Sequence, residues 1–433
     1  MMPQKSRQAD NSQSSDVFYW GASTAAHQIE GGNNNDWSRF EQADAVRLSK
    51  KFTKESAYGN GSLPEESWRN FHEQIANPEN YISGDGVDFW HTWKQDIKLL
   101  HELGLNSFRL SIEWSRIFPT PGDLNIAALK KYVQIVRELQ KNNIHPFITL
   151  HHFTNPLWVV DAGGWENPET ARHFAEYVEV IATAFEAIDD IHWCIFNEPE
   201  VYILMNCVQG SWPSERKSLR AALKVRKNFI GAHKTAYGIL KKYNGNWAAS
   251  TSLNMATVRP KKNIFLPINW MIARTLYLAQ MRLFMRPLRK HLDFIAIQQY
   301  MDNVVSLHKQ FQNPPTQPRS DLGWYLNPNS IAELVQDLSR YGKPVIVTEH
   351  GLADANDTRR AWYIEESLSN LLENKRSGSQ LAGYLHWSLL DNFEWEMGWW
   401  PQFGLYAVDR KTQARSKRAS ATTYADIIKN SQL

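Results

Sequence analysis

The chain has 433 residues with 48 basic and 45 acidic side chains, so its formal net charge is only +3. This balance gives no indication of a polyanionic partner such as nucleic acid. Two cysteines, Cys194 and Cys207, are too few for a disulfide framework and fit a reducing compartment.

The predicted elements begin after a polar N-terminal segment. Residues 1–15 contain no apolar stretch, which predicts a disordered tail rather than a signal peptide. No part of the sequence reaches the roughly 18 uninterrupted apolar residues that a membrane-spanning helix needs. We therefore expect a cytoplasmic protein with one folded domain over residues 16–433.

Strand-like and helix-like patterns alternate along this domain. Strands are predicted at Phe18–Gly21, Ser107–Ile112, His145–Leu150, Ile191–Asn197, Trp247–Asn254, Phe294–Gln299, Pro344–Thr348 and Leu381–His386. Helices are predicted at Val87–Leu103, Ile126–Asn142, Pro168–Glu186, Leu219–Tyr243, Phe265–His291, Ser330–Tyr341, Thr358–Glu373 and Lys417–Lys429. This order indicates an α/β fold, a closed (β/α)8 TIM barrel. Gln42–Ile82, Val208–Lys217 and His308–Leu326 are expected to be loop insertions on the catalytic face.

Polar residues gather where these predicted strands end. They are Arg109, His152, Asn197 with Glu198, Tyr300, Glu349 and Trp387. In a parallel barrel the strand ends share one face, so we expect these side chains to converge. Glu198 and Glu349 each close a short apolar run. Two carboxylates facing one bond are the minimum machinery for cleaving a glycosidic linkage.

Sequence motifs from residue 18 to about residue 409 resemble glycoside hydrolase family 1, the β-glucosidase and β-galactosidase family. The ordered set comprises the segments 18–31, 108–117, 150–153, 196–199, 347–351, 387–395 and 403–406. The resemblance implies a retaining exo-glycosidase that needs no metal or organic cofactor. Glu198 would be the general acid and base, Glu349 the nucleophile, and Arg109 and Tyr300 their supporting residues.

The same resemblance implies which residues hold the sugar. The set is Gln28, His152, Phe153, Asn197, Glu394, Trp395 and Phe403, with Trp387 as the floor. Asn197 would contact the 2-hydroxyl. Family members that act on 6-phosphorylated sugars carry Ser in place of Glu394. The run 394–402 has two carboxylates and no Lys or Arg, so it would repel a phosphate group.

The chain departs from the family pattern at a few positions, which affects the expected sugar contacts and not the expected reaction. His350 follows the nucleophile where Asn is usual, Gln298 and Gln299 precede Tyr300 where Asn and Tyr are usual, and Phe153 replaces a frequent Trp. We expect small-molecule β-glycosides or oligosaccharides as substrates, glucosides first and then fucosides and galactosides. The alternatives are a transglycosidase that uses the same intermediate and an inactive sugar-binding protein on the same barrel.

Residues 216–292 form a basic segment with 17 Lys and Arg and no Asp or Glu. Four arginines, Arg274, Arg282, Arg286 and Arg289, fall on one side of a predicted helix. Three interpretations remain open: a solvated basic helix face, a contact between subunits of a homo-oligomer, or docking on an anionic membrane surface. No nucleic-acid-binding motif accompanies the charge.

Overall fold

The computed structural model describes residues 17–54, 63–214, 216–263, 265–307 and 316–431. Eight strands close a parallel barrel in the order β1 (Tyr19–Ser23), β10 (Leu381–Trp387), β9 (Val345–His350), β7 (Ile295–Gln299), β5 (Ala248–Asn254), β4 (His192–Asn197), β3 (His145–His151) and β2 (Ser107–Ser111). The predicted (β/α)8 fold is confirmed, and each strand boundary lies within two residues of its prediction. The predicted tail, residues 1–15, lies outside the described residues.

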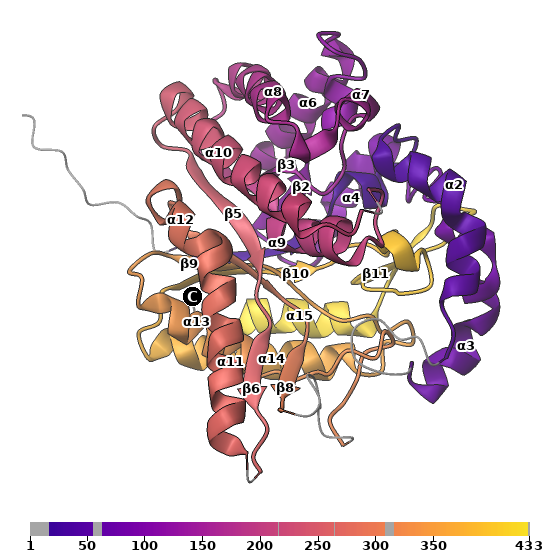
Figure 1. Ribbon diagram of the computed structural model, residues 1–433, viewed down its shortest axis with the longest axis vertical. Coiled ribbons are helices and arrows are strands. Elements are labelled where there is room, and N and C mark those ends of the chain that lie inside the picture. The colour runs from indigo at the N-terminus through magenta and orange to yellow at the C-terminus, as the bar shows by residue number, and fades with distance from the viewer. Residues whose placement is uncertain (1–16, 55–62, 215, 264, 308–315, 432–433) are drawn as a thin grey trace, which may run out of the picture.

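Helices surround this barrel (Figure 1). The larger ones are α4 (Phe89–Glu102), α6 (Ile126–Lys141), α8 (Glu169–Phe185), α10 (Leu219–Tyr243), α11 (Leu266–Gln280), α13 (Ser330–Ser339), α14 (Arg360–Arg376) and α15 (Ala419–Asn430). N-cap residues mark where two of these helices begin: the side chains of Ser218 and Asn125 accept hydrogen bonds from first-turn backbone amides of α10 and α6, respectively. No helix in the described part of the chain is long and apolar enough to span a membrane.

Short elements complete the chain. They are α1 (Ala26–Ile29), α5 (Trp114–Ile117), α7 (Leu157–Asp161), η2 (Gly164–Glu166), α9 (Pro199–Ile203), η3 (Leu204–Gln209), η4 (Met281–Met285), α12 (Arg286–Leu288), η5 (Arg289–His291), η6 (Trp395–Met397), β11 (Tyr406–Val408) and β12 (Arg415–Lys417). The predicted helix Phe265–His291 is therefore a chain of four helical pieces, α11, η4, α12 and η5.

The insertion predicted as loop at Gln42–Ile82 is mostly helical, so that prediction was wrong. It contains most of α2 (Asp36–Lys51), all of α3 (Glu65–Ala76) and η1 (Pro78–Tyr81). Asn35 and Ser38 form a capping box that starts α2, and Phe40 and Leu48 bury its inner face. A parallel pair, β6 (Thr257–Pro260) with β8 (Asp302–Val305), was also missed. Residues 308–315 of another predicted loop lie outside the described residues.

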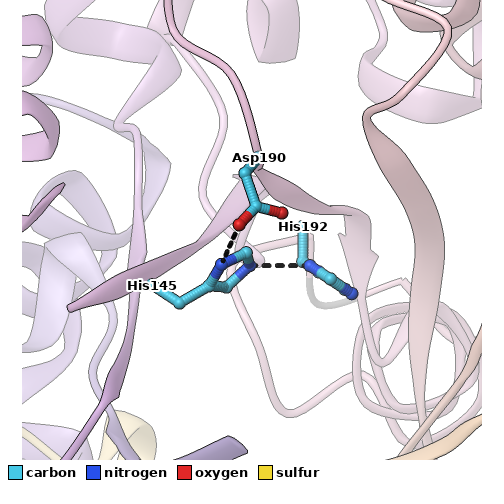
Figure 2. A group of neighbouring side chains, drawn as sticks. All are labelled: His145, Asp190 and His192. Carbon is cyan, nitrogen blue, oxygen red and sulfur yellow. Dashed lines mark hydrogen bonds and ion pairs between the residues drawn. The ribbon is translucent and has the colours of Figure 1, made fainter. Parts of the chain in front are cut away.

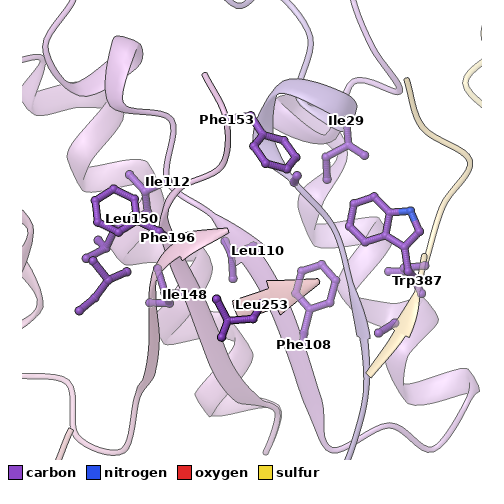
Figure 3. Packing of buried hydrophobic residues seen from close by; sticks show 14 of the residues in the cluster. Ile29, Phe108, Leu110, Ile112, Ile148, Leu150, Phe153, Phe196, Leu253 and Trp387 are labelled. Carbon is purple, nitrogen blue, oxygen red and sulfur yellow. The ribbon is translucent and has the colours of Figure 1, made fainter. Parts of the chain in front are cut away.

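Two apolar layers hold the barrel. Inside it, the Phe147 ring of β3 contacts both Tyr19 of β1 and Phe294, the residue before β7, across the N-terminal end of the lumen, although these strands are not neighbours. Cys194 belongs to this inner cluster, as a small buried hydrophobe should. On the outer side, residues such as Phe108, Leu110 and Ile148 pack beneath the helices (Figure 3). Because side chains alternate along a strand, Arg109 between Phe108 and Leu110 points into the lumen.

Candidate active site

A pocket opens at the C-terminal ends of the barrel strands. It is lined by Gln28, His152, Phe153, Asn197, Glu198, Val201, Leu204, Met205, Trp212, Asn254, Ala256, Tyr300, Met301, Trp324, Glu349, Trp387, Glu394, Trp395, Glu396, Met397 and Phe403. Every site residue expected from the sequence lines this pocket except Arg109. Arg109 is fully buried beneath it and bonds two of the lining side chains.

Glu349 lies near the end of β9 and is 3% exposed. The Arg109 guanidinium donates to one of its carboxylate oxygens, and the Tyr300 hydroxyl donates to the other at 2.5 Å. The chain leaves β9 at Gly351, and only glycine fits at this position. A Cβ built on Gly351 would lie 1.9 Å from the carbonyl oxygen of Trp387, the last residue of β10.

Glu198 follows β4 and begins the first turn of α9 in the left-handed backbone region, with φ of 40°. Its amide donates to the Ser252 carbonyl of β5 at 2.9 Å, and this bond fixes the turn. The side chain is 6% exposed. It accepts a hydrogen bond from Asn254 Nδ2 at 2.8 Å.

The two carboxyls have different electrostatic surroundings. Burial, followed by the charges of Glu349 and Glu200, raises the pKa of Glu198 well above its ordinary value. Burial raises the pKa of Glu349 as well, but the Arg109 charge and the hydrogen bonds from Tyr300 and Arg109 oppose that rise. Among the described residues only Asn254 donates to Glu198, whereas Arg109 and Tyr300 both donate to Glu349, so of the pair Glu198 keeps a proton more readily and Glu349 ionises more readily.

A polar network joins this pair to the neighbouring strands. The Asn197 side-chain oxygen accepts hydrogen bonds from Arg109 Nη2 at 2.6 Å and from Gln298 Nε2 at 2.8 Å. Its amide NH2 therefore remains to donate into the pocket. Gln298, one of the departures from the family pattern, thus holds Asn197 in place from β7.

Among the described residues, the lining atoms Gln28 Oε1, His152 Nδ1 and Trp212 Nε1 are buried without a hydrogen-bond partner, as is Gln298 Oε1 next to the pocket residue Asn197. The Gln28 NH2 group is already held by the Asn392 side chain and the Phe393 carbonyl. Because a buried polar atom without a partner costs about 1–3 kcal/mol, such atoms suit a ligand rich in hydroxyl groups.

Aromatic rings form the apolar walls of the pocket. The His152 ring lies nearly parallel to Trp387 and Trp395, at centroid distances of 6.3 Å and 6.0 Å. Phe153 stands edge-on to Trp395 at 5.1 Å. On the opposite wall Phe403 contacts Tyr300 at 6.2 Å. Flat rings beside hydrogen-bonding groups match the apolar faces and hydroxyl edges of a pyranose.

Glu394 and Glu396 lie in different settings. Burial and the nearby Glu349 raise the pKa of Glu394 to about 8. Glu396 forms an ion pair with Lys51 of α2, N to O 2.6 Å. The sequence run 394–402 contains no Lys or Arg, yet the fold brings this lysine to it from far along the chain.

Two other departures from the family pattern lie outside the pocket. His350 is fully buried, with Nδ1 bonded to the Gln299 carbonyl at 2.7 Å and Nε2 to Ser367 of α14 at 3.2 Å. Gln299 donates to Ser330 of α13 at 2.8 Å. Both side chains therefore join the barrel to its outer helices and do not contact a pocket ligand.

Several lining residues were missed from the sequence. Asn254 is the last residue of a predicted strand, so its position at a strand end could have identified it. Trp212 and Trp324 come from predicted insertions. Their positions in the pocket depend on how the insertions fold, and the sequence of these insertions has no periodic pattern that predicts their fold.

A (β/α)8 barrel with two buried carboxyls at the C-terminal ends of its fourth and seventh barrel strands defines the class of barrel glycoside hydrolases. The sequence model of Glycosyl hydrolase family 1 matches residues 11–268 and 271–433, and the chain belongs to this family.

Known relatives cover most of the chain. Beta-glucosidase A of Acetivibrio thermocellus is 29% identical, covering 95% of this chain and 97% of the relative. The solved β-glycosidase of Pyrococcus horikoshii has a TM-score of 0.78 at 30% identity, covering 95% of this chain and 93% of its own. A β-glucosidase mutant derived from a hyperthermophilic tetrameric structure has a TM-score of 0.80 at 26% identity, covering 95% and 94%.

Proposed function

We propose that this glycoside hydrolase is a retaining exo-β-glycosidase that removes terminal β-glucosyl residues by double displacement. One observation carries the proposal: Glu198 and Glu349 line the same buried pocket, and burial raises the pKa of both, but only at Glu349 do a buried cation and two donors oppose that rise strongly. One carboxyl keeps its proton, and the other is held as an anion by Arg109 and Tyr300. That is the pairing of acid and nucleophile that the retaining reaction uses.

In the first step, the Glu349 carboxylate attacks the anomeric carbon as the glycosidic C–O bond breaks. Glu198 gives its proton to the departing oxygen, which leaves as an alcohol. Once Glu349 is esterified its charge is gone, so the pKa of Glu198 falls and Glu198 becomes a base. It then takes a proton from water, whose oxygen attacks the anomeric carbon and releases Glu349.

The lining residues supply the sugar contacts in this proposal. The Asn197 NH2 group would donate to the 2-hydroxyl, a contact that strengthens in the transition state. Gln28, His152 and Glu394 would bond the other hydroxyls, and Trp387 and Trp395 would cover the ring. The similarity to Beta-glucosidase A supports glucose as the preferred sugar.

The test is hydrolysis of aryl β-glucoside, galactoside, fucoside, mannoside and 6-phosphoglucoside by the wild type and by Glu349→Ala. We expect turnover of neutral β-sugars, glucoside first, that is lost in Glu349→Ala while its melting temperature shows a folded protein. Proton NMR should detect the β-anomer first. First release of the α-anomer, or activity confined to the phosphorylated substrate, contradicts the proposal. Products larger than the substrate would identify a transglycosidase.

We further propose that a second copy of the chain binds the α11 surface, defined as Trp270, Met271, Leu276, Arg282, Leu283 and Arg286. Trp270 is 58% and Met271 59% exposed, and Arg274, Arg282, Arg286 and Arg289 are all exposed. α11 lies beside β6 and β8 at one end of the molecule (Figure 1). All 45 acidic residues lie outside the basic segment, which favours a complementary contact between copies. The relative derived from a tetramer supports this choice.

Light scattering during gel filtration tests this assembly. We expect an oligomer at low salt that weakens as salt rises. Arg282→Glu with Arg286→Glu, or Trp270→Ser, should yield a monomer, whereas Lys411→Glu outside the basic segment should not. A monomer at every salt concentration, or binding of anionic vesicles by the wild type as a monomer, would exclude the proposal.

A further inference from the structure

A cluster of three metal-binding residue types lies at the N-terminal end of the barrel, opposite the catalytic pocket. His145 is the first residue of β3 and His192 the first residue of β4, while Asp190 lies two residues before His192 (Figure 2). Within the described residues, this is the one group in which three His, Cys, Asp or Glu side chains bring ligand atoms together, all within 4.8 Å.

The three side chains already contact one another. His145 Nδ1 lies 3.2 Å from Asp190 Oδ2, and His145 Nε2 lies 2.7 Å from His192 Nδ1. The His145 side chain is 10% exposed, whereas that of Asp190 is 78% exposed. Solvent therefore reaches the cluster through Asp190, whose carboxylate contacts His145 from the exposed side.

We propose that His145, Asp190 and His192 bind a divalent transition-metal ion such as Zn²⁺. Two imidazole nitrogens and one carboxylate oxygen form the donor set that Zn²⁺ and its neighbours Cu²⁺ and Ni²⁺ prefer. With Zn–N bonds of about 2.1 Å in tetrahedral geometry, the two nitrogens must move from 2.7 Å to about 3.4 Å apart. The carboxylate must rotate toward the ion, and water completes the coordination.

The surroundings limit how the two imidazoles move. Tyr19 packs against both rings, at centroid distances of 4.7 Å from His145 and 5.0 Å from His192. Phe294 adds a contact to His192 at 5.0 Å. The nearby Lys241 is paired with Asp293 at 2.8 Å, which offsets its repulsion of a cation. Because residues at this end of a barrel serve stability, the ion should stabilise the fold without changing catalysis.

Zinc binding to the chelator-treated, dialysed enzyme tests the site, with calorimetric titration for affinity and thermal unfolding for stability. We expect one ion per chain, a raised melting temperature and an unchanged kcat. Asp190→Asn and His145→Gln should weaken the affinity about tenfold or more. Asp190 has a φ of 58°, a backbone conformation that Asn also tolerates, so Asp190→Asn should fold.

His173→Gln is the matched control. His173 Nδ1 lies 3.1 Å from Glu176 on the surface of α8, a His–carboxylate pair without the second imidazole. This variant should bind zinc as the wild type does. Absence of zinc binding, or equal affinity in the wild type, Asp190→Asn and His145→Gln, would show that the cluster is only a hydrogen-bonded chain and overturn the proposal.

Discussion

At the C-terminal end of the barrel, Gln28 Oε1, His152 Nδ1 and Gln298 Oε1 are buried with no hydrogen-bond partner in the described ranges. At the N-terminal end, His145, His192 and Asp190 bond to one another, and Tyr19, Phe147 and Phe294 fill the lumen. Each partnerless buried group costs about 1–3 kcal/mol. The comparison shows one end with an open pocket around partnerless polar atoms, and the other filled by aromatic rings.

The largest expected effect comes from Arg109→Met at the catalytic end. This change leaves Glu349 buried without its cation, so the pKa of Glu349 rises and less of it is ionised at neutral pH. We expect kcat to fall about 10³-fold, with the acid limb of the pH–rate profile moving to higher pH. Arg109→Lys keeps the positive charge, so its kcat should fall less than that of Arg109→Met. An acid limb that stays in place in Arg109→Met would show that Arg109 does not hold Glu349 ionised.

Phe147→Ala tests the opposite end. Removing a fully buried ring from the lumen should lower the free energy of unfolding by about 3–5 kcal/mol. Because Phe147 does not line the catalytic pocket, the kcat of the folded fraction should remain within about twofold of the wild type. Denaturant unfolding and active-site-normalised kinetics measure the two effects. A large loss of kcat with little loss of stability would contradict the division of roles.

Glu394→Gln should change how stability depends on pH. The pKa of Glu394 is raised to about 8 in the folded protein from an ordinary value of 4.5. Unfolding therefore releases its proton between those two values, so this group's contribution to stability is lost as pH rises toward 8. The variant lacks the titrating group, and its stability should decline less steeply, by up to about 1.4 kcal/mol per pH unit. Denaturant unfolding at several pH values measures this dependence. If the free energy of unfolding falls equally steeply with pH in Glu394→Gln and in the wild type, the prediction is wrong.

The smallest expected effect is that of Asn254→Ala. Asn254 donates to Glu198 and stabilises its ionised form, so its loss should raise the pKa of Glu198 further. In the proposed mechanism activity needs protonated Glu198, and the alkaline limb of kcat/KM should therefore move up by about one pH unit. A shift of that limb to lower pH would contradict the assigned direction.

The barrel and about half of the pocket lining could be predicted from the sequence. Short apolar runs ending in polar residues mark parallel strands, and strand ends share one face, so Glu198, Glu349, Asn197 and Tyr300 were expected together. Elements outside the barrel were harder. α2 and α3 lie in a largely polar insertion, although Trp68, Phe71 and Ile75 of α3 recur at helical spacing and could have identified it. β6 and β8 have only four residues each, too few for a clear alternation.

The sequence by itself determined the barrel, the two carboxylates and the family, because each depends on residue types in a fixed order along strands. Only the tertiary structure decided which partners surround those residues. Lys51 reaches Glu396, Arg109 bridges Asn197 and Glu349, and His350 faces α14 rather than the pocket. Such contacts join positions far apart in the chain, and the pKa differences between the carboxyls depend on them. The cluster at His145, Asp190 and His192 likewise exists only because two adjacent strands begin side by side.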